Sequence, residues 1–405
     1  MQSTRRSLLQ RAGLTSLLGA WPLNRLGAAS QRPSRIYDQL GIRPLINFRG
    51  THTTIGASKI HPGLHDAMAE ASREYVFLDE LQEKIGDRLA KLIGCEAAMV
   101  TTGAAGAISL GACAALTGDD MAKVRRLPDL TGMKTEVIIQ KPHRNGYDHA
   151  VRNTGVRIVD VENLEQFHKA IGPQTAMMYY LGGSSHDWTW ETPIPLEACL
   201  AAAKKAGFPV MVDAANMLPP WENLRKLAAA GVDLICISGG KHLRGPQCSG
   251  ILAGRKDLIR AASLNSSPNS DSLGRPMKVG REEMIGIWLA AERYAKLDFE
   301  ALDRQSAQQA DYLIGQLTRI AGLKAERTPF DRTRRVHRVL VRWDEQKLGL
   351  TAAEVEKQLR DGDPRIVVLR AQGQGIEFTV FMNDPGDEKF AARRMKEIFS
   401  PARQS

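Results

Sequence analysis

Short apolar runs alternate with amphipathic segments over most of the chain. The runs are apolar without interruption, as strands buried on both faces are, and a helical pattern follows most of them. Strands alternating with helices predict an α/β domain built on a mostly parallel sheet, which we place at residues 60–290. The expected strands are Ala97–Thr102, Glu136–Gln140, Val156–Asp160, Thr175–Leu181, Pro209–Asp213, Leu234–Ser238 and Ser249–Ala253.

Helical periodicity is longest in two places. It extends from Pro62 to Ile93 and again from about Glu282 to Ile320, and we expect continuous helical structure in both. Residues 291–405 also contain strand patterns that bracket a helix, which predicts a small C-terminal α+β domain. The patterns are Val336–Trp343, Ala352–Arg360 (helical), Arg365–Arg370 and Gly375–Phe381.

Composition is that of a globular protein. Hydrophobic residues make up 43% and charged residues 25%, close to the average for folded domains. No apolar run reaches the roughly 18 residues that a membrane span needs. The 5 cysteines have no C-x-x-C spacing and the histidines lack the spacing of a zinc site, so we expect buried free thiols and no metal.

Part of the net charge of +10 lies at the N-terminus. Residues 1–30 hold 4 arginines and no acid, so the remainder carries 10 − 4 = +6, a modest excess for a nucleic-acid-binding protein. Arg5 and Arg6 precede a weakly apolar stretch, Ala12–Leu23, and the small residues Ala28–Ser30. This order is typical of a twin-arginine signal peptide, which predicts export to the periplasm. An ordinary basic amphipathic helix on a cytoplasmic protein is the alternative.

Three candidate sites follow predicted strands, at the edge where open α/β sheets bind ligands. Gly103–Gly106 joins a strand to a helix, and its backbone N–H groups can bind an anion, although a packing role is the alternative. Asp213 ends an apolar strand, where a carboxylate needs a cationic partner or serves as a helix cap. Lys241 lies in a glycine-rich loop; desolvation there suits Schiff-base chemistry, and a surface lysine is the alternative.

Together these sites provide what pyridoxal phosphate requires of a protein. The cofactor needs an anion-binding helix start, an acid facing its ring nitrogen and a lysine for the covalent link. Asp213 precedes Lys241 by 28 residues, one strand–helix–strand unit. We therefore expect pyridoxal 5'-phosphate as the cofactor.

The same residues resemble a known family. D-x-A at Asp213 followed by S-G-x-K-x-x-x-G-P at Ser238 resembles the fold type I enzymes related to class V aminotransferases. The similarity is greater to the selenocysteine synthase-like group, the relatives of L-seryl-tRNA(Sec) selenium transferase, over about residues 36–385. It is carried by Leu45–Ser58, Leu81–Gly86, Glu96–Ala105, Lys141–Asp148, Ser238–Gln247 and Gly274–Glu282.

The resemblance implies a role for each site residue. Lys241 would hold the cofactor covalently and later transfer protons, and Asp213 would pair with the ring nitrogen. His143 and Ala215 would cover the two faces of the ring, and Asn216 would contact the ring hydroxyl. The residues that would hold the phosphate are Gly103, Ala104, Ala105 and Ser238.

Substrate and partners are also suggested by the resemblance. Arg370 is the candidate for the substrate carboxylate, with a structural ion pair as the alternative. Arg49 stands where relatives have a small residue, and either binds an acidic substrate group or forms a salt bridge. Residues 31–59 would line the active site of a homodimer or a higher assembly. The chain shows no counterpart of the separate domain with which selenocysteine synthase binds tRNA, so we expect a small amino-acid-like substrate.

These features predict a pyridoxal-phosphate-dependent lyase. We expect α,β-elimination of the ammonia-lyase type on an amino acid or an amino-sugar acid. An aminotransferase and a selenium transferase-like enzyme are alternatives within the family, and a non-catalytic binding module on the same fold is the alternative outside it. A desulfurase using Cys236 or Cys248 is disfavoured, because Cys248 lies too near the lysine loop to act as a mobile nucleophile.

Overall fold

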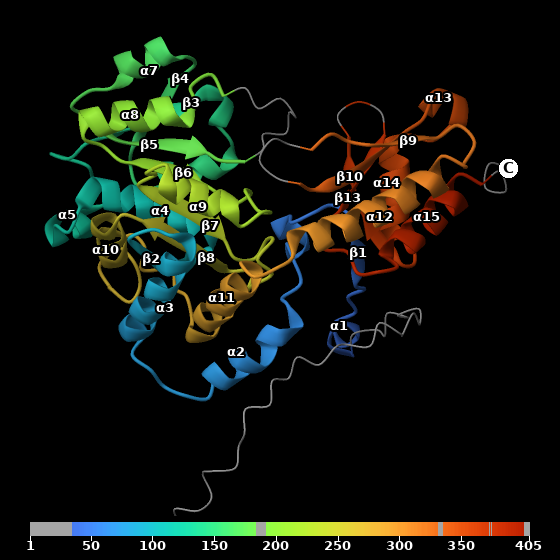
Figure 1. Ribbon diagram of the computed structural model, residues 1–405, viewed down its shortest axis with the longest axis horizontal. Helices are drawn as coiled ribbons and strands as arrows, with labels where there is room; N and C mark the ends of the chain where they lie inside the picture. Colours follow the sequence, from blue (N-terminus) through green and yellow to red (C-terminus); the bar gives the residue numbers. More distant parts are fainter. Residues whose placement is uncertain (1–34, 184–191, 331–334, 372, 374, 401–405) are drawn as a thin grey trace, which may run out of the picture. The chain divides into compact units, whose positions relative to one another are not determined.

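The computed structural model describes residues 35–183, 192–330, 335–371, 373 and 375–400 (Figure 1). The predicted signal peptide, residues 1–30, lies outside these ranges. The chain forms two compact units, Met1–Pro44 and Leu45–Ser405. In the first unit, the described part is the short helix α1 (Arg35–Gln39) and the residues that follow it.

A seven-stranded sheet forms the centre of the large domain (Figure 1). Its strand order is β2-β8-β7-β6-β5-β3-β4, and β8 is the strand that runs antiparallel to its neighbours. The seven strands predicted from the apolar runs are therefore confirmed, with ends that move by one residue at most. They are β2 (Ala97–Thr102), β3 (Glu136–Gln140), β4 (Arg157–Val161), β5 (Thr175–Leu181), β6 (Val210–Asp213), β7 (Leu234–Ser238) and β8 (Ser249–Gly254).

Helices cover both faces of this sheet. Ile138 of β3 packs into one hydrophobic cluster, while Val137 and Ile139 pack into the other, because successive strand residues point to opposite faces. The continuously apolar strands are thus explained by burial on both sides. The first cluster includes α3 (Leu78–Ile93), α7 (Leu164–Ala170), α8 (Leu196–Ala206), α9 (Glu222–Ala229) and α11 (Arg281–Tyr294); the second includes α4 (Gly103–Thr117) and α10 (Lys256–Leu264).

Both long helical predictions are wrong about continuity. The first segment divides into a short turn, then α2 (His65–Ala71) and α3. Arg281 causes part of this break, because its guanidinium donates to the carbonyls of Ala71 and Ser72, each at 2.9 Å, and so satisfies the end of α2. The second segment divides into α11 and α12 (Phe299–Leu317), and the Asp298 side chain caps α12 by accepting from Ala301 N at 2.9 Å.

The C-terminal domain contains a four-stranded antiparallel sheet in the order β12-β13-β10-β9. One predicted strand, Arg365–Arg370, divides between two sheets: β11 pairs with β1, whereas β12 joins the larger sheet. The elements are β1 (Leu45–Asn47), β9 (Lys324–Arg327), β10 (His337–Arg342), β11 (Arg365–Val367), β12 (Leu369–Arg370), β13 (Ile376–Val380), α14 (Ala352–Asp361) and α15 (Asp387–Ile398).

The start of the second unit belongs to this C-terminal domain. Ile46 and Phe48 lie in its hydrophobic core, with 2% and 0% of their surface exposed. Residues 31–59, predicted to line the active site, therefore also contribute two side chains to the core of the C-terminal domain. Among the residues that the structure describes, no helix has both the length and the hydropathy needed to cross a membrane.

Candidate cofactor site

The predicted site residues meet along one edge of the seven-stranded sheet. The strands β2, β7, β6, β5 and β3 are mutually parallel, so their carboxyl ends share that edge. The register pairs Leu181 with Asp213, Asp213 with Cys236, and Ser238 with Gly250. Neighbouring strands lie about 4.8 Å apart, so the tips of these strands form one continuous surface.

Asp213 carries a buried carboxylate whose hydrogen-bond donors are neutral. Tyr179 donates its hydroxyl to Oδ2 at 2.8 Å, and Ala215 N donates to Oδ1 at 3.0 Å. Burial and the charge of Asp213 raise the pKa of Tyr179 well above its usual value, so the phenol remains a donor. Within the described ranges no lysine or arginine forms an ion pair with this carboxylate, which leaves its charge available to a cationic ligand group.

His143 is also buried, with 2% of its surface exposed. Its Nδ1 accepts a hydrogen bond from Leu181 N at 3.2 Å, and Tyr180 packs edge-on against the ring with centroids 4.5 Å apart. The proton is therefore on Nε2, which is buried and has no partner in the described part of the chain. Burial lowers the pKa of His143 to about 4, so the ring is neutral at physiological pH.

The start of α4 is shaped to admit an anion. Gly103 has a φ of 66°, and a side chain at Gly250 would lie 2.4 Å from the carbonyl carbon of Gly103, so both positions require glycine. Thr102 precedes the helix, yet its side chain caps no helix N–H group, and its Oγ1 is buried without a partner among the described residues. Free N–H groups and an unused hydroxyl point to a bound phosphate.

Lys241 follows β7 in a tightly packed loop. A Cβ at Gly239 would lie 2.2 Å from Ser249 Oγ, and one at Gly240 would lie 2.5 Å from the backbone of Gln247. The N-terminal segment lies along this loop, since Ser58 donates to the carbonyl of Gly240 at 2.7 Å. The lysine is thus presented from a rigid turn beside the tips of the neighbouring strands.

Two predicted substrate-binding residues, Arg370 and Arg49, lie outside this edge of the sheet, whereas Asn216 lies on it. Arg370 lies on β12, 61% of its side chain is exposed, and its Nε lies 2.9 Å from Glu356. This is the ion pair that the sequence left open as an alternative. Arg49 follows β1 and has a buried Nε without a partner in the described ranges. Asn216 follows Asp213 in the turn after β6.

Two residues of the site were missed by sequence reasoning, and two cysteines are less buried than predicted. Tyr179 had a signal, because a tyrosine in a strand buried on both faces needs a polar partner. Thr102 had one too, since it stands directly before a predicted helix. Cys248 is exposed and Cys95 is half-buried, contrary to the expectation of buried free thiols, whereas the other three cysteines are buried.

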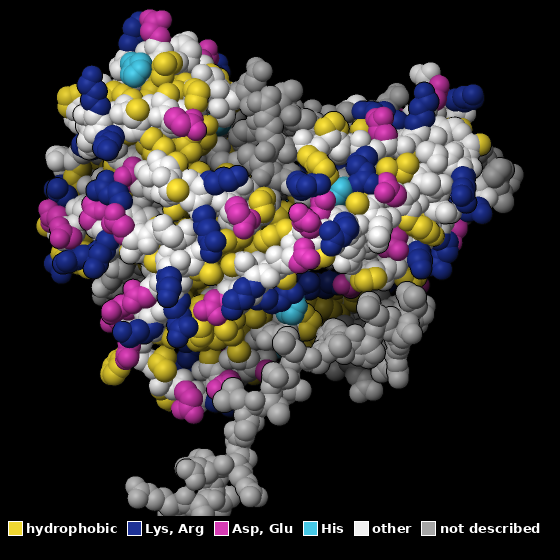
Figure 2. Space-filling model, viewed as in Figure 1, with side chains coloured by type: hydrophobic (Ala, Val, Ile, Leu, Met, Phe, Trp, Pro, Cys, Tyr) yellow, Lys and Arg dark blue, Asp and Glu magenta, His cyan; other side chains and the backbone are white. Residues whose placement is uncertain are grey.

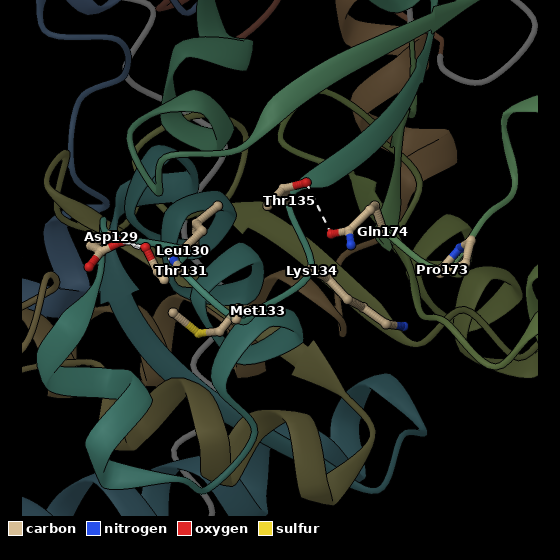
Figure 3. A pocket seen from close by; sticks show the side chains of 9 residues that line it. Asp129, Leu130, Thr131, Met133, Lys134, Thr135, Pro173 and Gln174 are labelled. Carbon is tan, nitrogen blue, oxygen red and sulfur yellow. Dashed lines mark hydrogen bonds between the residues drawn. The ribbon is translucent and has the colours of Figure 1, made fainter.

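A pocket elsewhere in the domain contains none of these residues. It has a volume of about 770 Å³ and lies at the amino ends of β3 and β5, the opposite edge of the sheet. Figure 3 shows its lining, where Thr135 donates to Gln174 at 3.2 Å. Lys134 is the one basic residue of this lining, and no group of three or more metal-ligating side chains occurs anywhere in the described chain.

The residues at the strand tips fit pyridoxal phosphate. The buried Nε2 of His143 and the Oγ1 of Thr102 have no partner within the described ranges. The carboxylate of Asp213 has two neutral donors there and no cationic one. Asp213 would hold the ring nitrogen, the start of α4 the phosphate, and Lys241 the aldehyde carbon. The ring nitrogen held in this way allows the cofactor to withdraw electrons from a bound amine.

Comparison with known proteins agrees with this fit. The family described as aminotransferase class-V matches residues 147–347. D-glucosaminate-6-phosphate ammonia lyase of Salmonella typhimurium is 32% identical over 377 residues, 90% of this chain and 97% of that protein. A 5'-C-glycyluridine monooxygenase-decarboxylase from a Streptomyces species is 30% identical over 375 residues, 89% and 91% of the two chains. The solved structure of a D-glucosaminate-6-phosphate ammonia-lyase superposes with a TM-score of 0.78 at 31% identity, covering 90% of this chain and 98% of that one.

The fold and the site therefore define a pyridoxal-phosphate-dependent enzyme of fold type I, as predicted. The chain belongs to the same family of these enzymes as the ammonia lyase. It is also similar to the selenocysteine synthase-like group, with 27% identity over 263 residues to an L-seryl-tRNA(Sec) selenium transferase of Rhizobium meliloti, 56% of this chain and 52% of that protein. The alternative of a non-catalytic module on the same fold is set aside, because the relatives across the full chain are enzymes.

Proposed function

We propose that this enzyme is a lyase that removes ammonia from an amino acid or an amino-sugar acid by α,β-elimination. The observation that carries the proposal is the buried carboxylate of Asp213, whose hydrogen-bond donors among the described residues are neutral. A charge held in this way favours a protonated ring nitrogen and hence chemistry that passes through a carbanion. The ammonia lyase at 32% identity over 90% of the chain supports elimination as the outcome of that chemistry.

Lys241 is the proposed acid and base. Its amine would take the proton from the carbon that bears the substrate amine, and would then protonate the departing β-hydroxyl group. The C–H and C–O bonds break, one water molecule leaves and an enamine forms. Water then hydrolyses the enamine to a 2-keto acid and ammonia, so the net change consumes no oxidant. Neutral His143 would cover the ring and keep water from it.

The experiment is a substrate screen with the purified holoenzyme. D- and L-amino acids and amino-sugar acids, with and without a phosphate group, are assayed for ammonia, 2-keto acid, carbon dioxide and oxygen uptake. We expect ammonia and 2-keto acid in equal amounts from a β-hydroxy substrate, with Lys241→Ala as the inactive control. Keto acid without ammonia would indicate transamination instead. Oxygen uptake with carbon dioxide release would indicate the reaction named for the Streptomyces relative.

Arg49 is proposed to bind an acidic group of the substrate. The supporting observation is its buried Nε, which has no partner among the described residues and would be costly to leave unpaired. Arg49→Ala should raise KM about 10-fold or more and leave the absorption band of the bound cofactor, near about 420 nm, unchanged. An unchanged KM would return Arg49 to a structural role.

A homodimer, or an assembly of dimers, is proposed as the working form. The loop between α2 and α3 supports this, because Tyr75 and Phe77 are 96% and 82% exposed. Neighbouring exposed aromatic residues are typical of interfaces. Changing both to serine should increase the monomer fraction in sedimentation, whereas Tyr312→Ser on α12 serves as the matched control. A wild-type enzyme active as a monomer would contradict the proposal.

Export through the twin-arginine pathway is proposed from Arg5 and Arg6 of the sequence. Changing both arginines to lysine should retain the protein in the cytoplasm. Fractionation with the wild-type chain alongside tests this, and equal periplasmic recovery of the two proteins would refute it. A tRNA substrate is not part of the proposal.

A further inference from the structure

A second pocket lies where three segments distant in sequence meet. It has a volume of about 530 Å³. The N-terminal segment, the lysine loop and the turn after β13 each contribute to it, and the ring of His242 packs on Phe381 of that turn with centroids 4.8 Å apart. The lining residues are Lys59, Ile60, Pro62, His65, Arg244 and Asp384.

The pocket adjoins the proposed catalytic lysine. Arg244 N donates to the carbonyl of Lys241 at 3.1 Å, so a single turn separates the guanidinium-bearing residue from the lysine. His61 N donates to the carbonyl of Arg244 at 2.9 Å, and Arg244 Nε donates to the carbonyl of Lys59 at 3.0 Å. The backbone of Arg244, which lines the pocket, is therefore one turn away from the backbone of Lys241.

Arg244 adopts a backbone conformation that glycine would adopt with less strain. Its φ is 55°, in the left-handed region where residues with a Cβ are uncommon. The turn is held by the backbone bonds to Lys241 and His61, which any residue could make. The geometry of the turn therefore does not require an arginine side chain at position 244.

Positive charge exceeds negative charge around the pocket. Burial lowers the pKa of Arg244 against the opposing effect of the nearby carboxylate of Asp384. Burial and the charge of Arg244 lower the pKa of Arg293 on α11, a second guanidinium close to Arg244. In the described part of the chain neither forms an ion pair, and Lys59 pairs with Asp384. Basic side chains and a histidine also gather on the face shown in Figure 2, near the α2 and α11 of Figure 1.

We propose that this pocket binds an acidic group of the substrate remote from its amino group, a phosphate or a second carboxylate, through Arg244 with Lys59. The inference rests on the proposed function and extends it by stating that the substrate carries two anionic ends. The carboxylate beside the amine stays near the ring, and the second anion reaches the pocket. An arginine suits this task because its planar guanidinium binds an oxyanion through two parallel hydrogen bonds.

The first experiment uses inorganic phosphate as the probe and the holoenzyme as the protein, so that the cofactor phosphate site is already filled. We expect titration calorimetry to show that Arg244→Gln weakens phosphate binding about 10- to 100-fold, and that Arg244→Lys weakens it less. Arg342→Gln, an exposed arginine paired with Glu326 on the C-terminal sheet, is the matched control. Equal phosphate affinity in Arg244→Gln and wild type would overturn the proposal.

The second experiment compares an amino-sugar acid with its phosphorylated form. Arg244→Gln should lower the kcat/KM for the phosphorylated form relative to the plain form by about 10- to 100-fold. An unchanged ratio together with Arg244-dependent phosphate binding would make this a site for free phosphate and overturn the substrate assignment. If no acid yields ammonia with wild type, the proposed function fails, while the phosphate titration still decides whether the pocket binds an anion.

A variant on the opposite side of the pocket covers the case in which Arg244→Gln does not fold. Asp384→Asn removes the carboxylate that pairs with Lys59 and leaves the shape of the side chain unchanged. Phosphate binding should then tighten several-fold, about the effect of one added exposed charge. Weaker or unchanged phosphate binding in Asp384→Asn would overturn the proposal.

Discussion

Two buried histidines of this molecule have different surroundings. His143, at the edge of the large sheet, and His337, on β10 of the C-terminal sheet, are 2% and 4% exposed. His337 has a charged residue on each side: its Nε2 lies 3.0 Å from Asp303, and Arg327 contacts its Nδ1. His143 has a backbone donor on one nitrogen and nothing from the described chain on the other. Burial alone therefore does not distinguish a structural histidine from a ligand-binding one.

Two buried acids repeat the contrast. Oε1 of Glu377 on β13 lies 3.6 Å from Nε of Arg338 on the neighbouring strand. Burial raises the pKa of Glu377, and the charge of Arg338 opposes this rise. Asp213 of β6 has the hydroxyl of Tyr179 and one backbone N–H group. In the C-terminal sheet the buried histidine and acid have charged neighbours, whereas among the described residues those of the large sheet have neutral ones. This difference can be tested by paired substitutions.

The largest effect is expected at Lys241. Lys241→Ala should abolish the covalent link to the cofactor and lower activity by about 1,000-fold or more, because no other group would take the substrate proton. The circular dichroism spectrum should remain that of the folded protein. Borohydride reduction followed by peptide mapping checks the link, and a pyridoxyl group found on another lysine would disprove the assignment.

Asp213→Asn and Glu377→Gln form the next pair. Asp213→Asn removes the charge that holds the ring nitrogen, and we expect activity to fall about 100-fold. Glu377→Gln should change activity by less than about 2-fold, because its partner is within the C-terminal sheet. Steady-state rates and thermal melts of both variants separate the two outcomes. Equal losses of activity in the two variants would contradict the proposed difference between the two sheets.

Arg370 tests the contrast between the two sheets most directly. It lies on the C-terminal sheet, yet the sequence predicts that it binds substrate. Arg370→Ala should raise KM about 10-fold if that prediction holds. Glu356→Gln, which removes only the ion-pair partner, should leave KM unchanged. Matching small stability losses in the two variants, with no change in KM, would assign Arg370 to a structural pair.

The smallest effect concerns pH. An unfolded histidine ionises near pH 6.5, while folded His143 stays neutral down to about 4. The unfolded chain therefore binds the extra proton, and the stability that neutral His143 contributes above pH 6.5 is lost as pH falls from 6.5 towards 4. His143→Phe should reduce the slope of unfolding free energy against pH by up to about 1.4 kcal/mol per unit in this window. Denaturant titrations at several pH values measure it, and parallel slopes would count against a buried neutral His143.

Much of the large domain could be predicted from the sequence. Its strands are short apolar runs, and burial on both faces leaves that signal in consecutive residues. Asp213 and Lys241 could be identified because each directly follows such a run, and the carboxyl ends of parallel strands share one edge. The start of α4 could be identified for the same reason. These features depend on residues that are close together in the sequence, so local sequence patterns are sufficient to predict them.

Other features are decided by contacts between distant residues. The division of Arg365–Arg370 between two sheets depends on pairing with Leu45–Asn47, and the end of α2 depends on Arg281. The bond of Tyr179 to Asp213 requires the register of β5 against β6, and the second pocket requires Arg244 to meet Lys59. Local periodicity determines which segments form strands and helices. Which polar groups then find partners is decided only when those segments pack, because that depends on register and on the approach of residues far apart in the chain.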